Sequence, residues 1–169
     1  SVIEVAGRLK AALDVERVTK KFYGEFDTQR LEFIELIGGI ADDHQRRWYA
    51  SVLMNRLMFI YFLQKKFFLD NRNVNYLSDK LDFSRTKLGA DKFFPVFLKA
   101  LFFEGFAKPE LARSVDAKAM LGKIRYLNGG LFLPHRVELN HGFPDKPRIK
   151  IPDAAFDSIF ALFSRYSWN

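Results

Sequence analysis

A carboxylate and an acid–lysine pair in the second half of the chain are the residues best suited to catalysis. Glu110 follows a proline, and Asp116 and Lys118 then form the pattern Asp-Ala-Lys. Clustered carboxylates beside a lysine can bind Mg²⁺ and position a water molecule for phosphodiester hydrolysis. Such sites usually lie on adjacent strands, whereas this segment has the pattern of a helix or a loop. A magnesium-dependent nuclease built on these three residues is therefore an alternative function rather than the leading one.

Other catalytic chemistry has few candidates. The chain has no cysteine, and the spacing of its three histidines, His44, His135 and His141, fits no zinc site, so we expect them in loops or helix caps. The sequence also contains no Gly-x4-Gly-Lys-Ser/Thr loop, no Gly-x-Gly-x-x-Gly turn after a strand and no Gly-x-Ser-x-Gly turn. Nucleotide hydrolysis and acyl transfer thus lack their usual motifs.

Pairs of basic residues suggest a polyanionic partner. The 27 Lys and Arg residues against 20 Asp and Glu residues give a formal net charge of +7. Cations that contact DNA phosphates gain affinity by releasing counterions. If these pairs lie on one surface, they can contact phosphates along a DNA backbone. The alternative is that each pair lies on a solvated helix face and is balanced by acids such as Glu16, Glu25 and Glu35. The candidate nucleic-acid residues are Lys20, Lys21, Arg46, Arg47, Lys65, Lys66, Arg148 and Lys150.

Two features point to the core. Arg56 lies in the most apolar predicted helix, where an unpaired charge is costly, so we expect it to pair with a buried carboxylate or with carbonyl groups. The 19 Phe residues predict an aromatic core. One stripe of them favours core packing over a base-stacking platform. Its members are Phe93, Phe94, Phe97, Phe102 and Phe103.

Apolar residues recur at helical spacing in four segments, which we predict to be helices. The second is apolar on nearly every face, as expected of a central buried helix. The predicted helices cover about 14–37, from 42 or 43 to 68, 91–106 and 152–165, and a short helix over 109–115 follows the third.

Turn signals lie between these helices. Residues 70–90 are rich in Asn, Asp, Ser and Lys, which predicts a long mobile connection with at most one short helical turn. Asn128, Gly129 and Gly130 predict a tight structural turn with positive φ at glycine. A backbone-amide contact with phosphate or with a neighbouring domain is the alternative role of that turn. We expect a short extended segment over 148–151.

These patterns predict a mainly α fold, an irregular helical bundle with a long central buried helix and a loop-rich C-terminal third. The 169 residues suit a single helical domain over 1–169. Because the chain starts at Ser1, we expect a fragment of a larger multidomain protein. We find no signal peptide and no apolar run long enough to cross a bilayer, so we expect a cytoplasmic protein that does not contact a membrane. A free-standing helical protein-interaction module is a further alternative.

Four segments, in this order, resemble the helical region of large bacterial restriction-modification proteins, in particular the type IIG kind and similar phage-defence methylases. They are DVERVTKKFYGEF (14–26), MNRLMFIYFLQKKFFL (54–69), IRYLNGGLF (124–132) and IPDAAFDSIFALFSRYSW (151–168). In that family one chain carries a nuclease domain, a helical connector, an adenine-N6 DNA methyltransferase and a target-recognition domain. The resemblance extends over nearly the whole chain.

The resemblance implies a non-catalytic connector that packs between the nuclease and methyltransferase domains of its own chain and meets double-stranded DNA as part of the parent protein. The family's Asn-Pro-Pro-Tyr box and glycine-rich cofactor turn do not occur in the sequence. We therefore carry over no catalytic, cofactor-binding or metal residue. S-adenosylmethionine and Mg²⁺ are implied for the parent protein and not for this fragment.

Overall fold

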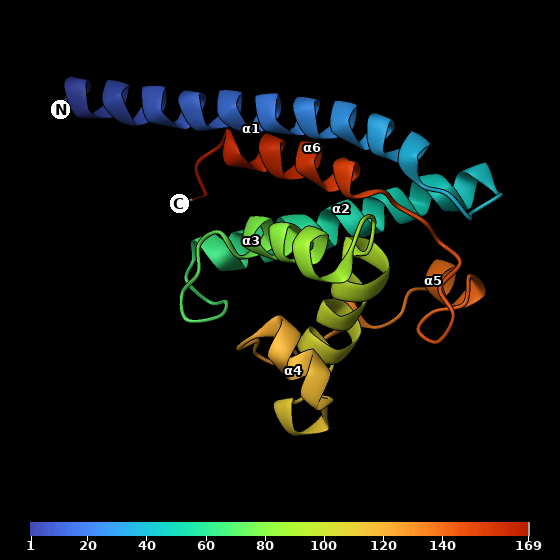
Figure 1. Cartoon of the computed structure of the whole chain (residues 1–169). Helices are drawn as coiled ribbons and strands as arrows, with labels where there is room; N and C mark the ends of the chain where they lie inside the picture. Colours follow the sequence, from blue (N-terminus) through green and yellow to red (C-terminus); the bar gives the residue numbers. More distant parts are fainter. Residues whose placement is uncertain (169) are drawn as a thin grey trace.

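Helices and loops make up almost all of the structure, a computed structural model that describes residues 1–168 (Figure 1). Within that range the only β pairing is an isolated antiparallel bridge between Gly38 and Lys150, so the predicted mainly α fold is confirmed. The α-helices are α1 (Val2–Leu36), α2 (Asp43–Lys65), α3 (Tyr76–Phe83), α4 (Val115–Leu121), α5 (Arg136–Asn140) and α6 (Asp153–Ser164). Short π-helical or 3-10 segments lie at Ser84–Leu88, Phe93–Leu98, Leu101–Phe106, Glu110–Ala112 and Gly130–Phe132.

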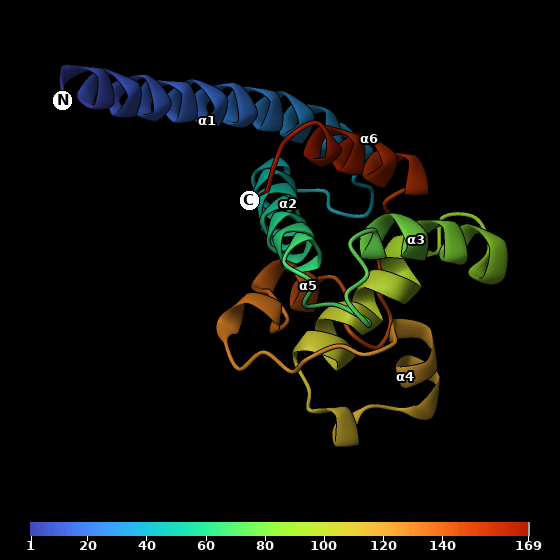
Figure 2. The same cartoon turned by 90° about the vertical axis from the view of Figure 1, so that its left-hand side faces the viewer.

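The central buried helix predicted from the sequence is α2. Its side chains are buried on most faces, and Tyr49, Leu53 and Leu57 are each 0% exposed. The helices α1 and α6 pack against α2 and against each other (Figures 1 and 2). α6 begins and ends within one residue of its predicted bounds, because its buried apolar side chains recur at helical spacing.

The Phe-rich segment forms two π-helical turns, Phe93–Leu98 and Leu101–Phe106, in place of one regular helix. Pro95 lies in the first turn, where a missing backbone N–H leaves no hydrogen bond unmade. All five rings of the predicted aromatic stripe are at most 7% exposed. The prediction that this stripe belongs to the core is confirmed.

The first helix is much longer than predicted, because it begins at Val2 rather than near Asp14. Ser1 caps it: the Ser1 hydroxyl accepts the Glu4 backbone N–H at 3.3 Å, and the Ser1 amino group contacts the Glu4 carboxylate at 2.8 Å. Residues 1–21 are exposed almost everywhere and project away from the rest of the chain (Figure 2). A helix without a buried face shows no core-facing periodicity, which is why the sequence did not place its start.

The predicted mobile connection over 70–90 is wrong for its second half. Residues 76–83 form α3, and a π-helical turn continues to Leu88. Tyr76, Leu77 and Leu81 are at most 3% exposed, and the Tyr76 hydroxyl donates to the Leu121 carbonyl at 2.7 Å. Buried side chains and hydrogen bonds, including one from the Leu77 N–H to the buried Gln64 side chain at 2.9 Å, hold this helix, although the polar residues around them resemble a loop.

Two further local predictions are wrong. In place of a helix over 109–115, a 3-10 turn is followed by α4, which Ser114 caps by accepting the Ala117 N–H at 3.1 Å. The segment Asn128-Gly129-Gly130 has no residue with positive φ, since Gly129 is extended and a 3-10 helix follows. The path of the chain is fixed here by contacts with α2, described below, rather than by a glycine turn.

The extended segment expected over 148–151 is present as the bridge to Gly38. The Gly38 N–H donates to the Lys150 carbonyl at 2.7 Å, and the Lys150 N–H donates back at 2.9 Å. Gly39 has a φ of 86°, and an added Cβ there would lie 2.0 Å from the Arg148 carbonyl oxygen. Between such contacts the last third of the chain is rich in loops, as predicted.

Candidate nucleic-acid interface

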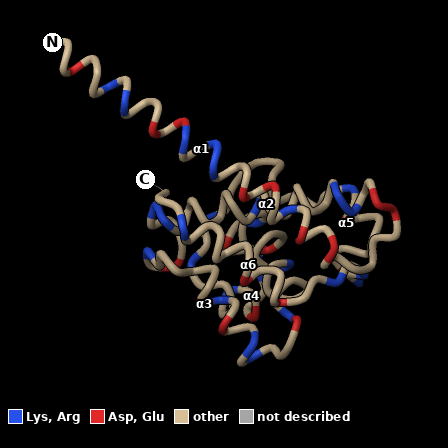
Figure 3. Tube along the Cα trace, turned by 90° about the horizontal axis from the view of Figure 1, so that it is seen from above, with Lys and Arg blue, Asp and Glu red and all other residues tan. Residues whose placement is uncertain are grey.

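The four basic pairs do not form one surface. Lys20 and Lys21 lie on α1, whereas Arg46 and Lys65 lie near opposite ends of α2, about 28 Å apart at 1.5 Å per helical residue. Lysine and arginine positions accordingly occur at both ends of the helical body and along α1 (Figure 3). Any contact with nucleic acid must therefore be assigned to individual pairs.

Two of the pairs are balanced by acids on their own helices. Lys20 lies 3.0 Å from Glu16, and Lys21 lies 4.0 Å from Glu25. Both Arg46 and Arg47 contact the Asp43 carboxylate, at 2.7 and 2.8 Å, and hydrogen bonds from Arg47 and then Arg46 lower the pKa of Asp43. Both pairs therefore agree with the alternative interpretation of the sequence, in which basic pairs lie on solvated helix faces and are balanced by acids.

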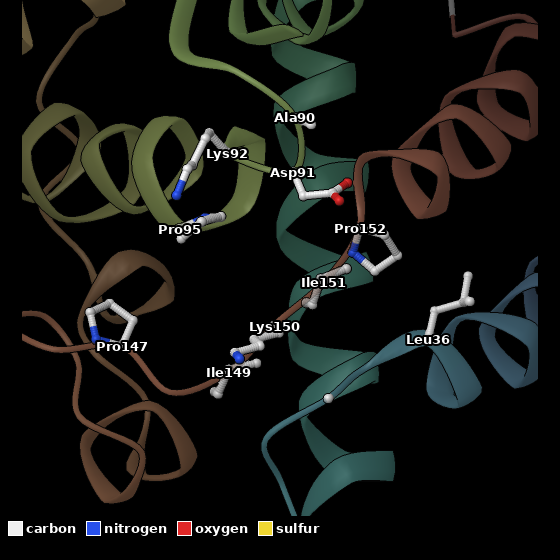
Figure 4. A pocket seen from close by; sticks show the side chains of 11 residues that line it. Leu36, Ala90, Asp91, Lys92, Pro95, Pro147, Ile149, Lys150, Ile151 and Pro152 are labelled. Atoms are coloured by element: carbon white, nitrogen blue, oxygen red, sulfur yellow. The ribbon is translucent and has the colours of Figure 1, made fainter.

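Arg148 and Lys150 are close in sequence but differ in their contacts. The Arg148 guanidinium donates to the Asn140 carbonyl at 2.8 Å. Lys150 is exposed and lines a groove of about 520 Å³ together with Lys92 and three prolines (Figure 4). The one carboxylate in this groove, that of Asp91, accepts the Asp153 backbone N–H at 2.9 Å. This groove is thus basic and open, but its walls are mostly apolar.

Lys65 and Lys66 lie beside aromatic rings, Lys65 beside the buried ring of Tyr61 and Lys66 beside the exposed ring of Phe62. Within residues 1–168 neither lysine has a carboxylate within 4.0 Å, and the same is true of Arg72 in the following loop. The Lys66 ammonium lies 5.7 Å from the centre of the Phe62 ring, and the Arg72 guanidinium lies 4.7 Å from that of Phe67. We call this surface the α2 tip. It consists of Phe62, Lys65, Lys66, Phe67, Phe68 and Arg72.

The backbone of the α2 tip ends the helix in a Schellman motif. The Phe68 N–H donates to the Leu63 carbonyl at 3.0 Å, and the Phe67 N–H donates to the Gln64 carbonyl at 3.1 Å. Phe67 occupies the left-handed position, with a φ of 66°, where glycine is the usual residue. Both rings project outward, and Phe67 and Phe68 are 50% and 57% exposed.

Contacts with the backbone of residues 122 and 123 fix the loop that follows the α2 tip. Leu69 is only 2% exposed. The Asp70 N–H donates to the Lys123 carbonyl at 2.9 Å, and the Asp70 carboxylate accepts the Lys123 N–H at 3.1 Å. Gly122 makes room for that carboxylate, since an added Cβ would lie 2.5 Å from Asp70 Oδ1. The Asp70 carboxylate is therefore hydrogen-bonded to the backbone beneath the α2 tip.

Arg56, in the middle of α2, is paired as predicted. Its guanidinium is 1% exposed and makes two contacts with the Glu138 carboxylate, at 2.9 and 3.0 Å. It also donates to the carbonyls of Leu131 and Leu133, at 2.9 and 3.0 Å. The Tyr49 hydroxyl donates to Glu138 at 2.6 Å, and burial together with the Glu138 charge raises the pKa of Tyr49 well above its usual value. This group of contacts fixes the segment that contains the predicted glycine turn.

The residues of the nuclease alternative are exposed on short elements. Glu110 begins a 3-10 turn, and Asp116 and Lys118 lie on α4. His44 lies in the first turn of α2, whereas His135 and His141 flank α5, and His135 caps that helix by accepting the Val137 N–H at 3.1 Å. Across residues 1–168, no three His, Asp or Glu side chains are grouped so that they could hold a metal ion.

Sequence reasoning missed the aromatic half of the α2 tip. Lys65 and Lys66 are among the predicted basic pairs, whereas Phe62, Phe67, Phe68 and Arg72 are not predicted site residues. The signal is the run Lys-Lys-Phe-Phe at the end of an apolar helix, where two rings follow two cations after the last buried turn.

Comparisons with family models, curated proteins and solved structures found no significant match for this chain. No helix among residues 1–168 combines the length and the apolar character needed to cross a bilayer.

Proposed function

We propose that this chain is the non-catalytic helical connector of a type IIG-like DNA restriction-modification protein and that it contacts the DNA backbone through the α2 tip. The proposal combines the sequence resemblance with one structural observation: both Lys65 and Lys66 have no acidic partner within 4.0 Å among residues 1–168, while the basic pairs on α1 and at the start of α2 do. In the fourth pair, the Arg148 guanidinium is bonded to the Asn140 carbonyl. Cations without acidic partners are the ones free to replace counterions at phosphates.

The aromatic core suits a rigid spacer. Rings from distant segments pack together, as where Phe132 stacks on Phe106 with ring centres 4.5 Å apart and α6 packs on α1 through Phe163 and Phe26. Under this proposal the rigid body holds a nuclease domain and an adenine-N6 methyltransferase domain at a set spacing on one DNA. S-adenosylmethionine and Mg²⁺ then act in those neighbouring domains, in the cytoplasm.

The test is binding of a fluorescein-labelled DNA duplex of arbitrary sequence, followed by anisotropy from 20 to 200 mM salt. We expect weak, sequence-independent and salt-sensitive binding, and Lys65→Gln with Lys66→Gln to weaken it about tenfold at the lowest salt. Lys20→Gln with Lys21→Gln is the matched control, because those lysines have acidic partners, and we expect it to change affinity by less than about twofold.

Three results would contradict the proposal. They are no duplex binding at 20 mM salt, equal losses in the two double variants, and saturable binding of S-adenosylmethionine by the chain itself. Mg²⁺-dependent cleavage of a plasmid that disappears in Asp116→Ala would instead support the nuclease alternative.

A further inference from the structure

The exposed rings of the α2 tip are not explained by contact with a duplex. Lysines suffice to follow a phosphate backbone, and the bases of a duplex are already stacked and paired. Phe67 and Phe68 nevertheless leave about half of their surface in water. We propose that these two rings stack on unpaired bases, so that the α2 tip is a binding site for single-stranded DNA. This inference rests on the proposed DNA contact of the same surface.

The chemistry of the tip matches that class of ligand. Sites for single-stranded nucleic acid combine cations that follow the backbone with aromatic faces that accept bases of any sequence. At the tip, Lys66 and Arg72 lie 5.7 and 4.7 Å from the centres of exposed rings, so both parts of such a site are side by side. Lys65 precedes Lys66 in the chain, and its ammonium lies 5.3 Å from the centre of the buried Tyr61 ring.

The rings are presented by a fixed backbone. Phe67 and Phe68 both donate their N–H groups to the last turn of α2, at 3.1 and 3.0 Å, and Asp70 is bonded on both sides to Lys123. A ring held in place before binding loses little freedom when a base stacks on it. Glycine would adopt the left-handed conformation at position 67 with less backbone strain than phenylalanine does. The phenylalanine at this position is therefore not explained by the stability of the fold, which is consistent with a role for its ring in binding.

The charge of the surface favours nucleic acid over an apolar protein partner. Two cations, Lys66 and Arg72, lie beside exposed rings, and the nearby carboxylate of Asp70 accepts a backbone N–H of Lys123. Interfaces between proteins are depleted of lysine at their centres, whereas sites for single strands require cations there. Docking of a neighbouring protein domain on the same rings is the competing outcome in the test.

The experiment uses the full chain with a labelled 12-nucleotide oligothymidylate and a 12-base-pair duplex, at the same salt concentration. We expect the parent to bind the single strand more tightly than the duplex. Stacking contributes at least about fivefold in affinity per base, so Phe67→Gly with Phe68→Ala, which removes two rings, should lose at least about 20-fold for the single strand. The same variant should change duplex affinity by less than about twofold.

Leu111→Ala is the matched control, since Leu111 is 98% exposed and lies on another element. It should leave both affinities unchanged. Phe67→Gly alone is the second variant, because glycine suits the left-handed position; it should keep or raise the melting temperature while weakening single-strand binding.

Three results would overturn the inference. Single-strand affinity that stays within twofold in the ring variants would mean that the rings serve another partner, such as a neighbouring domain. Equal losses for single strand and duplex would mean that the rings only shape the site. A parent that prefers the duplex would also contradict it. In each case, loss of duplex binding on Lys65→Gln with Lys66→Gln would still support the proposed function, so the two failures are distinguishable.

Discussion

The middle and the end of α2 use positive charge in opposite ways. Arg56 is 1% exposed, and Glu138 and the carbonyls of Leu131 and Leu133 all accept its hydrogen bonds. Lys65, two and a half turns later, lies beside an aromatic ring and has no carboxylate within 4.0 Å among residues 1–168. One helix thus carries a cation that fixes the fold and a cation without a carboxylate partner among the described residues.

The difference shows why basic composition alone is a poor guide to binding. The net charge of +7 counts Arg56, Arg46 and Lys65 equally. The contacts of each side chain are needed to distinguish the three cases: Arg56 is in a buried ion pair, Arg46 is in a surface ion pair, and Lys65 has no carboxylate partner among the described residues. Variants at Arg56 and at the α2 tip should therefore differ in what they change, stability in the first case and binding in the second.

The largest effect is expected at Arg56. We expect Arg56→Met to destabilise the fold by about 3–5 kcal/mol, because it leaves the buried Glu138 carboxylate without its cation. Adding Glu138→Gln removes that charge while keeping an acceptor for Tyr49, so the double variant should be more stable than Arg56→Met alone. Urea unfolding measures both. Additive losses in the double variant would show that the pair is not the source of the effect.

Gly122 connects the folded body to the α2 tip. Gly122→Ala places a Cβ 2.5 Å from Asp70 Oδ1 at a φ of 73°, so we expect a loss of about 1–2 kcal/mol in unfolding free energy. The displaced loop should also weaken single-strand binding, although Gly122 itself carries no charge or ring. Gly129→Ala is the control, because nothing lies within 4 Å of an added Cβ there. Equal effects of the two changes would contradict the role assigned to Gly122.

At the tip itself, Phe67→Gly should raise stability. A phenylalanine with a φ of 66° is strained, and glycine relieves that strain at this position in a Schellman motif. We expect a gain of about 0.5–1 kcal/mol in urea unfolding. A loss of stability would mean that the Phe67 ring packs on the body more than its 50% exposure indicates.

The smallest effect concerns His135, which caps α5 next to the Arg56 pair. Burial lowers the pKa of His135 below its usual value, so the folded state favours the neutral ring. Stability is therefore full above the unfolded pKa of about 6.5 and falls as the pH drops below it, because the unfolded chain binds the proton more readily. Unfolding at pH 7.5 and 5.5 should show this loss in the parent and a smaller one in His135→Asn, whose side chain can still cap the helix. An equal loss in the two proteins would assign the effect to another group.

Periodicity predicted the parts of the fold that bury one face. The helix α6, the central position of α2 and the class of partner for Arg56 all follow from apolar spacing and from the cost of an unpaired buried charge. The identity of that partner does not, because Glu138 is 82 positions away along the chain. Pairing over such a separation depends on tertiary structure.

The remaining differences have local causes. The first turns of α1 bury nothing, so no pattern marks them, and α3 is held by buried side chains and hydrogen bonds among polar residues. At the α2 tip and in the loop beside it, Phe67, Asp70, Asn71 and Arg72 all have positive φ, a conformation common for Asp and Asn but not for Phe or Arg, so composition does not predict it at Phe67 and Arg72. The full set of candidate site residues is therefore evident only from the structure, in which the loop that contains Arg72 follows directly after the lysines.

The most direct test of the central claim is the salt dependence of duplex binding by the parent and by Lys65→Gln with Lys66→Gln. If these two lysines contact phosphates, the slope of log affinity against log salt should become less steep by about 2 in the double variant, with no change in unfolding free energy beyond about 0.5 kcal/mol. An unchanged slope would contradict the assignment of the DNA contact to the end of α2.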